Sequence, residues 1–385
     1  MPEQHLICGE NGLPQTVLKS ADRSDGPKAI ASEIIPLTNP RQTGIIAAIK
    51  KVSQTPIAMG NNDLAASYTE IFSDAEKARE HFEKLRWPEG PVCPQCGELN
   101  NAFRLTPQES KKDKHVRSGV WKCRGCREQF TVTVGTVFED SHVPLNRWLL
   151  AIHLLCASKK GMSAHQLYRM MGTFYGEKGS YKTAWFMFHR LRFAMTQHPM
   201  IDKLKGVVEV DEVWIGPKER GIGGGAGNRL SKKRPVVALM ERSESGSRVR
   251  SFPLERVTVA NLKPIMQEHV EVGTTIQTDE SVVYHFMHDE FPKHDVVNHA
   301  RREYSRREDG RHITTNTVEG YFGLLRRGIY GTYHHVGRGY LQQYLNEFDF
   351  RYNLRKMPDS ERTVLAIKAA EGKRLTMREP SANSA

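Results

Sequence analysis

Apolar and polar residues alternate along the chain with two different periods, which separate a helical part from a part that mixes strands and helices. Between residues 144 and 196, apolar residues recur every three to four positions in three runs, LNRWLLAIHLLCA, SAHQLYRMMG and YKTAWFMFHRLRFAM. This period predicts three amphipathic helices. A further helix is expected to begin at Ser73 or Asp74, either of which can cap it, and to end before Pro88. Residues 1–68 keep no period, and we expect a disordered tail there.

Beyond residue 200 the order of elements predicts an RNase H-like fold. Three strand-like runs, VVEVDEVWIG, RPVVALMER and SRVRSFPLE, follow one another with hairpin-like connections. A helix, the strand-like run TTIQTDE, another helix, the short strand-like run HDVVNHA and two final helices, 317–328 and 339–351, complete the series. Three strands followed by alternating helices and strands is the order of an RNase H-like domain, an α/β fold with a mixed five-stranded sheet.

Two C-x-x-C motifs predict a structural zinc site. Cys93 and Cys96 form the first motif, and Cys123 and Cys126 form the second. Four thiolates complete a tetrahedral shell and leave no open position, so we expect Zn²⁺ in a structural role. One such motif alone would also suit a redox pair, but two together favour zinc. Cys156 fits neither motif, and we interpret it as a buried small hydrophobic residue.

The charge balance favours a polyanionic partner. The chain of 385 residues holds 56 Lys and Arg against 44 Asp and Glu, a net charge of +12, and basic side chains that neutralise phosphates release counterions from DNA. Basic residues, Arg124 among them, crowd the cysteine motifs; they form either a DNA grip or a solvated face. The helices of residues 144–196 resemble a helix-turn-helix arrangement, with an ordinary helical connector as the alternative.

No feature of the sequence indicates a membrane protein. No run reaches the ~18–20 apolar residues of a membrane helix, and the first residues lack the pattern of a secretory signal. We therefore expect a cytoplasmic protein that associates with the nucleoid and has no membrane partner.

Three carboxylates stand where an RNase H-like fold brings acids together. Asp211 interrupts the first apolar strand, where a buried carboxylate is costly unless a cation or a donor compensates it. Asp279 ends the fourth strand, and Glu319 lies near the start of a late helix. Together they are expected to hold two Mg²⁺ or Mn²⁺ ions, one activating the attacking oxygen and the other stabilising the leaving oxygen. Asn316, one turn before Glu319, competes for the third place.

Each acid also has a structural interpretation. Asp211 would cap a turn or pair with an arginine, Asp279 would cap the following helix, and Glu319 would pair with Arg326. Basic residues surround the proposed site, and we expect DNA contacts from two of their groups. The glycine-rich stretch PKERGIGGGAGNRLSKKRP lacks a P-loop pattern and suits a flap that closes on a DNA backbone. The residues concerned are Lys232 and Lys233 in this stretch, and Arg326 and Arg327 in the late helix.

The motifs together resemble those of a known family. CPQCG, CRGC, GMSAHQLYRMMG, YKTAWFMFHR, VEVDEVWIG, TDES, NTVEGYFGLLRRGIYGTYHHV and YLNEFDFRYN are similar, in this order, to bacterial insertion-sequence transposases that carry an N-terminal zinc ribbon and are related to the Merlin elements. The resemblance covers residues 72 to 353. Two segments, the tail and GTFYGEKGS, look longer than the family pattern, and Arg326 stands where a lysine is usual.

The resemblance implies a DDE-type active site made of Asp211, Asp279 and Glu319. The third position varies in this group between Glu, Asn and His, which keeps Asn316 as an alternative. Such enzymes bind the terminal inverted repeats of the element, cut its ends with water and join the freed 3′-hydroxyl to target DNA, generally as homo-oligomers. A zinc-ribbon DNA-binding regulator and a structure-selective nuclease remain as alternative functions.

These interpretations divide the chain into five parts. The parts are a disordered tail (1–68), a zinc ribbon with a leading helix (69–140), a helical DNA-binding or connector segment (141–200), an RNase H-like catalytic domain (201–355) and a C-terminal tail (356–385).

Overall fold

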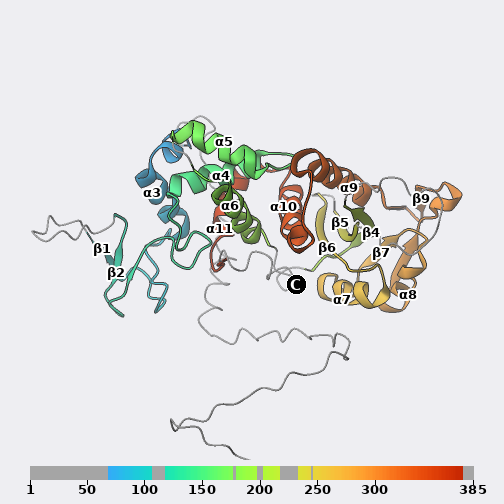
Figure 1. Ribbon diagram of the computed structural model, residues 1–385. Coiled ribbons are helices and arrows are strands. Elements are labelled where there is room, and N and C mark those ends of the chain that lie inside the picture. Colours follow the sequence, from blue (N-terminus) through green and yellow to red (C-terminus); the bar gives the residue numbers. More distant parts are fainter. Residues whose placement is uncertain are drawn as a thin grey trace, which may run out of the picture. The chain divides into compact units, whose positions relative to one another are not determined.

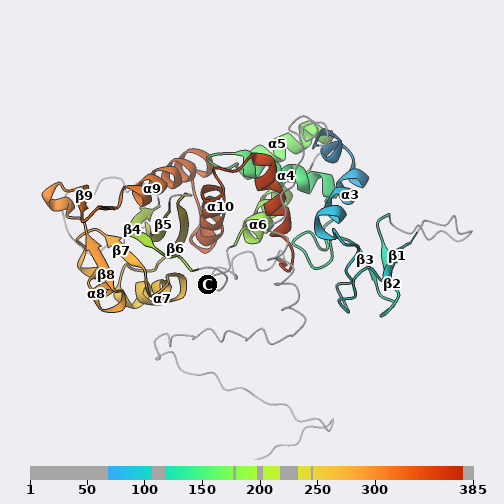
Figure 2. The same ribbon diagram turned by 180° about the vertical axis from the view of Figure 1, so that it is seen from behind.

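The computed structural model of the chain describes residues 68–105, 118–176, 179–196, 203–216, 233–243 and 246–375 (Figures 1 and 2). The tail expected at residues 1–68 lies outside these residues, except for Tyr68. Lys232 and residues 217–231 of the glycine-rich stretch also lie outside them, whereas Lys233 is described.

Helix α3 (Ala75–Arg86) begins as predicted at Asp74, whose carboxylate accepts hydrogen bonds from the backbone N–H groups of Glu76 and Lys77. It supports a small antiparallel sheet of strands β1 (Ala102–Arg104), β2 (Trp121–Cys123) and β3 (Gln129–Phe130). We call residues 91–105 and 118–130 the cysteine lobe. Glu83 of α3 ties the two together, because its carboxylate accepts from Arg104 at 2.6 Å and from the Trp121 indole at 3.2 Å.

The three predicted helices are confirmed as α4 (Leu145–Ala157), α5 (Ala164–Tyr175) and α6 (Tyr181–Ala194). Ser163 caps α5 and Ser180 caps α6 with their hydroxyl groups. Their apolar sides form one core with Phe82 of α3. Cys156 is fully buried in this core, as its interpretation as a small hydrophobic residue requires.

Helix α11 (Asp359–Lys368) corrects the expectation of a tail from residue 356. The helix packs on α4, where Ala366 and Ile367 join the shared core, and Arg362 donates a hydrogen bond to the Cys156 carbonyl at 2.7 Å. Pro358 at the N-cap and acids in the first turn are ordinary signals of a helix start. The helix was not predicted because its apolar positions are few and lie among many polar residues.

The predicted mixed five-stranded sheet is confirmed, and its strand order is β6-β5-β4-β7-β8. The strands are β4 (Val207–Ile215), β5 (Arg234–Arg242), β6 (Arg248–Pro253), β7 (Thr275–Thr278) and β8 (Lys293–Val296). Strands β4, β5 and β6 are antiparallel, whereas β4, β7 and β8 run parallel. β7 pairs with the first three residues of β4, so β7 ends beside the middle of β4.

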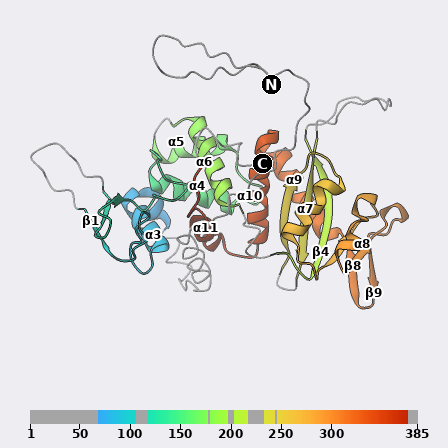
Figure 3. The same ribbon diagram turned by 90° about the horizontal axis from the view of Figure 1, so that it is seen from below.

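Helices cover both faces of this sheet. On one face, Val213 of β4 packs with residues of α9 (Asn316–Gly328) and α10 (Leu341–Asn353). On the other face, Val208 and Val210 pack with α7 (Val259–His269). Helix α10 also contacts α6, so it lies between the helical segment and the sheet (Figures 1 and 3).

Two elements after β7 differ from the prediction. The helix expected there is a single 3₁₀ turn (Val282–Tyr284) and the short α8 (Met287–Glu290). The basic run near residue 305 forms a hairpin of β9 (Ser305–Glu308) and β10 (Arg311–Thr314). Its two-residue turn, Asp309-Gly310, has positive φ angles of 50° and 73°, and Asp-Gly is a strong hairpin signal. The charged residues on both sides masked the strand pattern.

Candidate active site and zinc site

The four cysteines of the two motifs meet in the cysteine lobe. Their Sγ atoms all lie within 4.8 Å of one another, with 3.6 Å between those of Cys93 and Cys126 and 3.6 Å between those of Cys96 and Cys123. A tetrahedral zinc ion with Zn–S bonds of about 2.3 Å separates its sulfurs by about 3.8 Å. The donor set and its spacing therefore fit structural Zn²⁺.

Zinc removal should unfold this lobe. Its three strands hold only three, three and two residues, so the metal must supply much of the folding free energy. We expect Cys93→Ser to reduce the zinc content from about one ion per chain to near zero and to increase proteolysis within residues 91–130. Elemental analysis and limited proteolysis measure both effects. Cys156→Ser, outside the motifs, should keep its zinc; a purified wild-type chain without zinc would refute the assignment.

Asp211 and Asp279 lie near each other where strand β7 ends beside the middle of β4. Glu209 of β4 is in register with Gln277 of β7, each acid follows two residues later, and the charge of Asp279 acts on Asp211. Both side chains are partly buried. The Asp211 carboxylate accepts the Glu212 backbone N–H at 2.7 Å, and the Asp279 carboxylate accepts the Ser281 N–H at 3.0 Å. The second of these bonds lies before the 3₁₀ turn Val282–Tyr284, whose N-cap is Ser281, so Asp279 does not cap the following helix as its structural interpretation expected.

Glu319 approaches this pair from α9. It lies in the first turn of that helix, its side chain is 43% exposed, and it accepts a hydrogen bond from the Thr315 hydroxyl at 3.3 Å. The basic group near its carboxylate is His299, at 3.9 Å. Asn316, the competing residue, is the exposed first residue of α9, and its backbone N–H bonds to Thr314.

The electrostatics of Asp211 link these acids. Burial raises the pKa of Asp211 to about 8; the Glu212 N–H opposes this rise, while the negative charges of Glu212, Asp279 and Glu319 add to it. Burial also raises the pKa of Asp279, against the Ser281 N–H. The oxygens of the three predicted acids do not all lie within 4.8 Å of one another, unlike the cysteine sulfurs. The negative charges of Asp279 and Glu319 both act on Asp211, and a nearby cation would favour its charged form.

Two groups near these acids, His299 and Glu280, were not identified from the sequence. His299 lies between Asp279 and Glu319, and Glu280 holds its loop by accepting the His299 N–H at 2.8 Å. Glu212 points to the opposite face of β4 from Asp211, as strand alternation predicts, and bonds to the buried Tyr284 hydroxyl there. The sequence VNHA carried no spacing that tied His299 to the acids.

The predicted DNA-contacting residues lie at different places. Arg326 and Arg327 are exposed in the last turn of α9, two turns beyond Glu319. Lys233 directly precedes β5 and is partly buried. Arg124 is exposed in the cysteine lobe, with its guanidinium 5.2 Å from the centre of the Phe103 ring.

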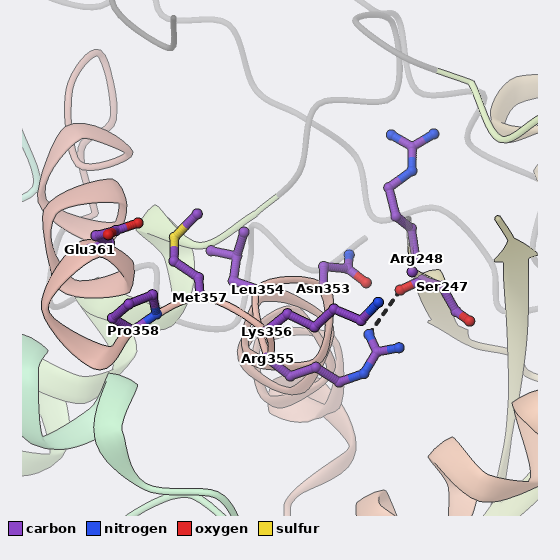
Figure 4. A pocket seen from close by; sticks show the side chains of 10 residues that line it. Ser247, Arg248, Asn353, Leu354, Arg355, Lys356, Met357, Pro358 and Glu361 are labelled. Carbon is purple, nitrogen blue, oxygen red and sulfur yellow. Dashed lines mark hydrogen bonds between the residues drawn. The ribbon is translucent and has the colours of Figure 1, made fainter. Parts of the chain in front are cut away.

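A cavity of about 470 Å³ is lined by none of these acids (Figure 4). It is lined by residues 246–248, 353–358 and 361, and Arg355 crosses it to donate to the Ser247 carbonyl at 2.9 Å. Arg248 of β6 is in register with Glu241 of β5, which pairs with the beginning of β4 rather than with Asp211. This cavity therefore belongs to the opposite end of the sheet from the acids.

Comparison with known proteins identifies two family domains in the chain. Residues 203–353 match the ISXO2-like transposase domain, and residues 73–129 match the transposase zinc-ribbon domain. A relative from Halobacterium salinarum, an uncharacterized protein in the transposable element ISH50, is 25% identical over 319 residues, which cover 76% of this chain and 97% of that protein. Among the described helices, none combines the length and the apolar character that a membrane span needs.

The first match spans the strands and helices that carry Asp211, Asp279 and Glu319, and the second spans the four cysteines. The two matches follow one another in the order that the sequence motifs predicted. The chain therefore belongs to the insertion-sequence transposases that combine an N-terminal zinc ribbon with an ISXO2-like transposase domain.

Proposed function

We propose that this transposase binds the terminal inverted repeats of its own insertion sequence, cuts the DNA there and joins the freed 3′ ends to target DNA, with Asp211, Asp279 and Glu319 as the catalytic acids. The observation that carries the proposal is the neighbouring position of Asp211 and Asp279 on parallel strands, with the charge of Glu319 acting on Asp211 from α9. A protein that only binds DNA gains nothing from three carboxylates that repel one another.

The donor set fits Mg²⁺ or Mn²⁺. It consists of carboxylate oxygens, which hard divalent cations prefer, and it is partly open to solvent, which leaves room for water and a substrate phosphate. When bound, such ions activate the attacking oxygen and stabilise the leaving oxygen. Asp211 and Asp279 would hold them from the sheet, and Glu319 would close the site from the helix.

The chain's basic groups would place the DNA against these acids. Arg326 and Arg327 share α9 with Glu319, and Lys233 stands at the start of the strand next to β4. Arg124 belongs to the cysteine lobe, which would grip DNA outside the reacting phosphate. Contacts of this kind fix the register of the backbone, and their strength falls with rising salt.

Glu319 and Asn316 can be separated by mutation. We expect Glu319→Gln to lower the cleavage rate by at least about 100-fold, because an amide cannot neutralise a dication. Asn316→Ala should lower it by less than about tenfold. Single-turnover cleavage of a labelled end duplex measures both rates. The opposite ranking would make Asn316 the third ligand.

The proposed activity is tested with duplexes that carry the inverted repeats flanking the gene. The purified chain with Mg²⁺ should release a 3′-hydroxyl at the repeat and join it to a target plasmid, and paired-end products should require more than one copy of the chain. Cleavage without joined product would indicate a nuclease. Binding of the repeats without any cleavage would indicate the zinc-ribbon regulator.

A further inference from the structure

A buried glutamate of the sheet holds the first turn of α9. Glu209, two residues before Asp211, has no solvent exposure. One of its carboxylate oxygens accepts the Thr317 hydroxyl at 2.8 Å, and the other accepts the Val318 backbone N–H at 2.9 Å. The first N–H groups of a helix have no partner within the helix, and the side chain of the N-cap residue, Thr315, accepts no hydrogen bond from them. Glu209, which lies on strand β4, therefore takes the place of an N-cap side chain for α9.

Two polar residues of neighbouring strands connect Glu209 to the chain that leads into α9. Arg242 of β5 lies 3.3 Å from the Glu209 carboxylate and donates to Gln277 at 3.1 Å and to the His312 carbonyl at 2.6 Å. Gln277 of β7 in turn accepts the Thr314 N–H at 3.1 Å. Strands β4, β5 and β7 thus fix the end of β10 and the start of α9 together.

Glu319 itself has few contacts that would position it. Its side chain is 43% exposed, and its contacts are the Thr315 hydroxyl at 3.3 Å and the His299 ring at 3.9 Å. Its place opposite the sheet is consequently set by the backbone of the first helical turn. Glu209 grips that turn one and two residues before Glu319, and by strand alternation it shares a face of β4 with Asp211.

We propose that Glu209, with Arg242 and Gln277, is a positioning cluster that sets the distance between Glu319 and Asp211. This inference rests on the proposed function, in which both acids bind the catalytic metal. A shift of about 1 Å in one ligand is enough to impair such a site. Through this cluster, strand β4 positions both Asp211, which it carries, and Glu319, which lies on α9.

The test compares Glu209→Gln with the wild type in the full chain. Glu209→Gln keeps the side-chain volume and removes the charge. We expect faster amide hydrogen exchange in residues 315–322. We also expect the Mn²⁺ dissociation constant to rise by at least about fivefold, measured from the electron paramagnetic resonance signal of free Mn²⁺. DNA affinity should stay unchanged. Thr317→Val, which removes one of the two donors to Glu209, should give smaller changes of the same kind and provides a milder variant should Glu209→Gln not fold.

Glu241→Gln is the matched control. Glu241 is also a buried carboxylate paired with an arginine, Arg248. It lies on β5 and accepts hydrogen bonds from the Lys205 backbone N–H and the Arg248 guanidinium, which lie outside α9. The Glu241→Gln variant should have the same amide hydrogen exchange in α9 and the same Mn²⁺ affinity as the wild type.

The outcomes separate this inference from the proposed function. Wild-type exchange and Mn²⁺ affinity in both Glu209→Gln and Thr317→Val would overturn the positioning role, even if Asp211→Asn abolishes Mn²⁺ binding as the proposed function requires. If Asp211→Asn binds Mn²⁺ like the wild type, the proposed function fails and the inference fails with it. Equal changes in Glu241→Gln would also overturn the inference, because they would show a general effect of losing a buried charge.

Discussion

Asp211→Asn is expected to abolish Mg²⁺-dependent cleavage, with a loss of at least about 1,000-fold, while the affinity for end DNA changes by less than about threefold. Asn keeps the shape of the side chain but removes the charge that would hold a cation between β4 and β7. DNA contacts would come from basic groups elsewhere, so binding should persist. Single-turnover cleavage and fluorescence anisotropy with the same duplex measure the two effects. Normal cleavage by Asp211→Asn would remove this residue from the active site.

The same substitution should stabilise the metal-free protein. Burial raises the pKa of Asp211 to about 8, helped by Glu212, Asp279 and Glu319 and opposed by the Glu212 N–H. Since the ordinary pKa of an aspartate is near 3.9, the folded state disfavours the charged form, and stability falls as the pH rises from about 4 to about 8. Asn avoids this loss. Without metal, the melting temperature of Asp211→Asn should exceed that of the wild type by several degrees at pH 8 and by little at pH 4.

Mg²⁺ should reverse this difference, because it stabilises the wild type alone. Thermal melts at both pH values, with and without Mg²⁺, test the sign. Glu241→Gln is a suitable control for losing a buried carboxylate elsewhere in the sheet. An Asp211→Asn protein that melts below the wild type at pH 8 without metal would contradict the account.

Glu347→Gln is expected to lower the free energy of unfolding by about 3–5 kcal/mol, because it leaves buried arginines without a counter-charge. Glu347 of α10 and Arg192 of α6 are almost completely buried and lie 2.7 Å apart. The same carboxylate is 2.9 Å from Arg351 and accepts the Tyr333 hydroxyl at 2.6 Å. The Arg192 guanidinium also stacks 3.8 Å from the centre of the Tyr344 ring.

This cluster joins the helical segment to the RNase H-like domain, so its loss should be visible in the unfolding of both. Denaturant unfolding followed by circular dichroism measures the change. Tyr333→Phe removes one neutral hydrogen bond and should cost only about 1 kcal/mol. A Glu347→Gln protein within about 1 kcal/mol of the wild type would show that the ion pair contributes little to stability.

The elements that carry the three acids were predictable because each has a strong local pattern. Asp211 interrupts an otherwise apolar strand, Asp279 ends another, and Glu319 begins an amphipathic helix. The order of the elements then predicted the sheet, in which Asp211 and Asp279 each follow two residues after the paired Glu209 and Gln277. The four cysteines were predictable for a similar reason, since their spacing is local and few side chains bind metal in that pattern.

The remaining parts depend on contacts that no local pattern encodes. His299 reaches Glu319 because Glu280 holds the loop that carries His299. Glu209 bonds to Val318 of α9, which lies 109 residues later in the chain. The hairpin at residues 305–314 and helix α11 are rich in charged residues, which weakened the apolar period that identifies strands and helices. A buried polar contact is decided by the tertiary fold rather than by its neighbours in sequence.

The most direct test of the account is the position of a bound divalent cation. Crystals of the chain with an end duplex and Mn²⁺ should give anomalous difference density between the carboxylates of Asp211, Asp279 and Glu319, within coordination distance of all three side chains. Density at another place, or ordered end DNA beside these three acids with no cation among them, would contradict the central claim that they form the catalytic metal site.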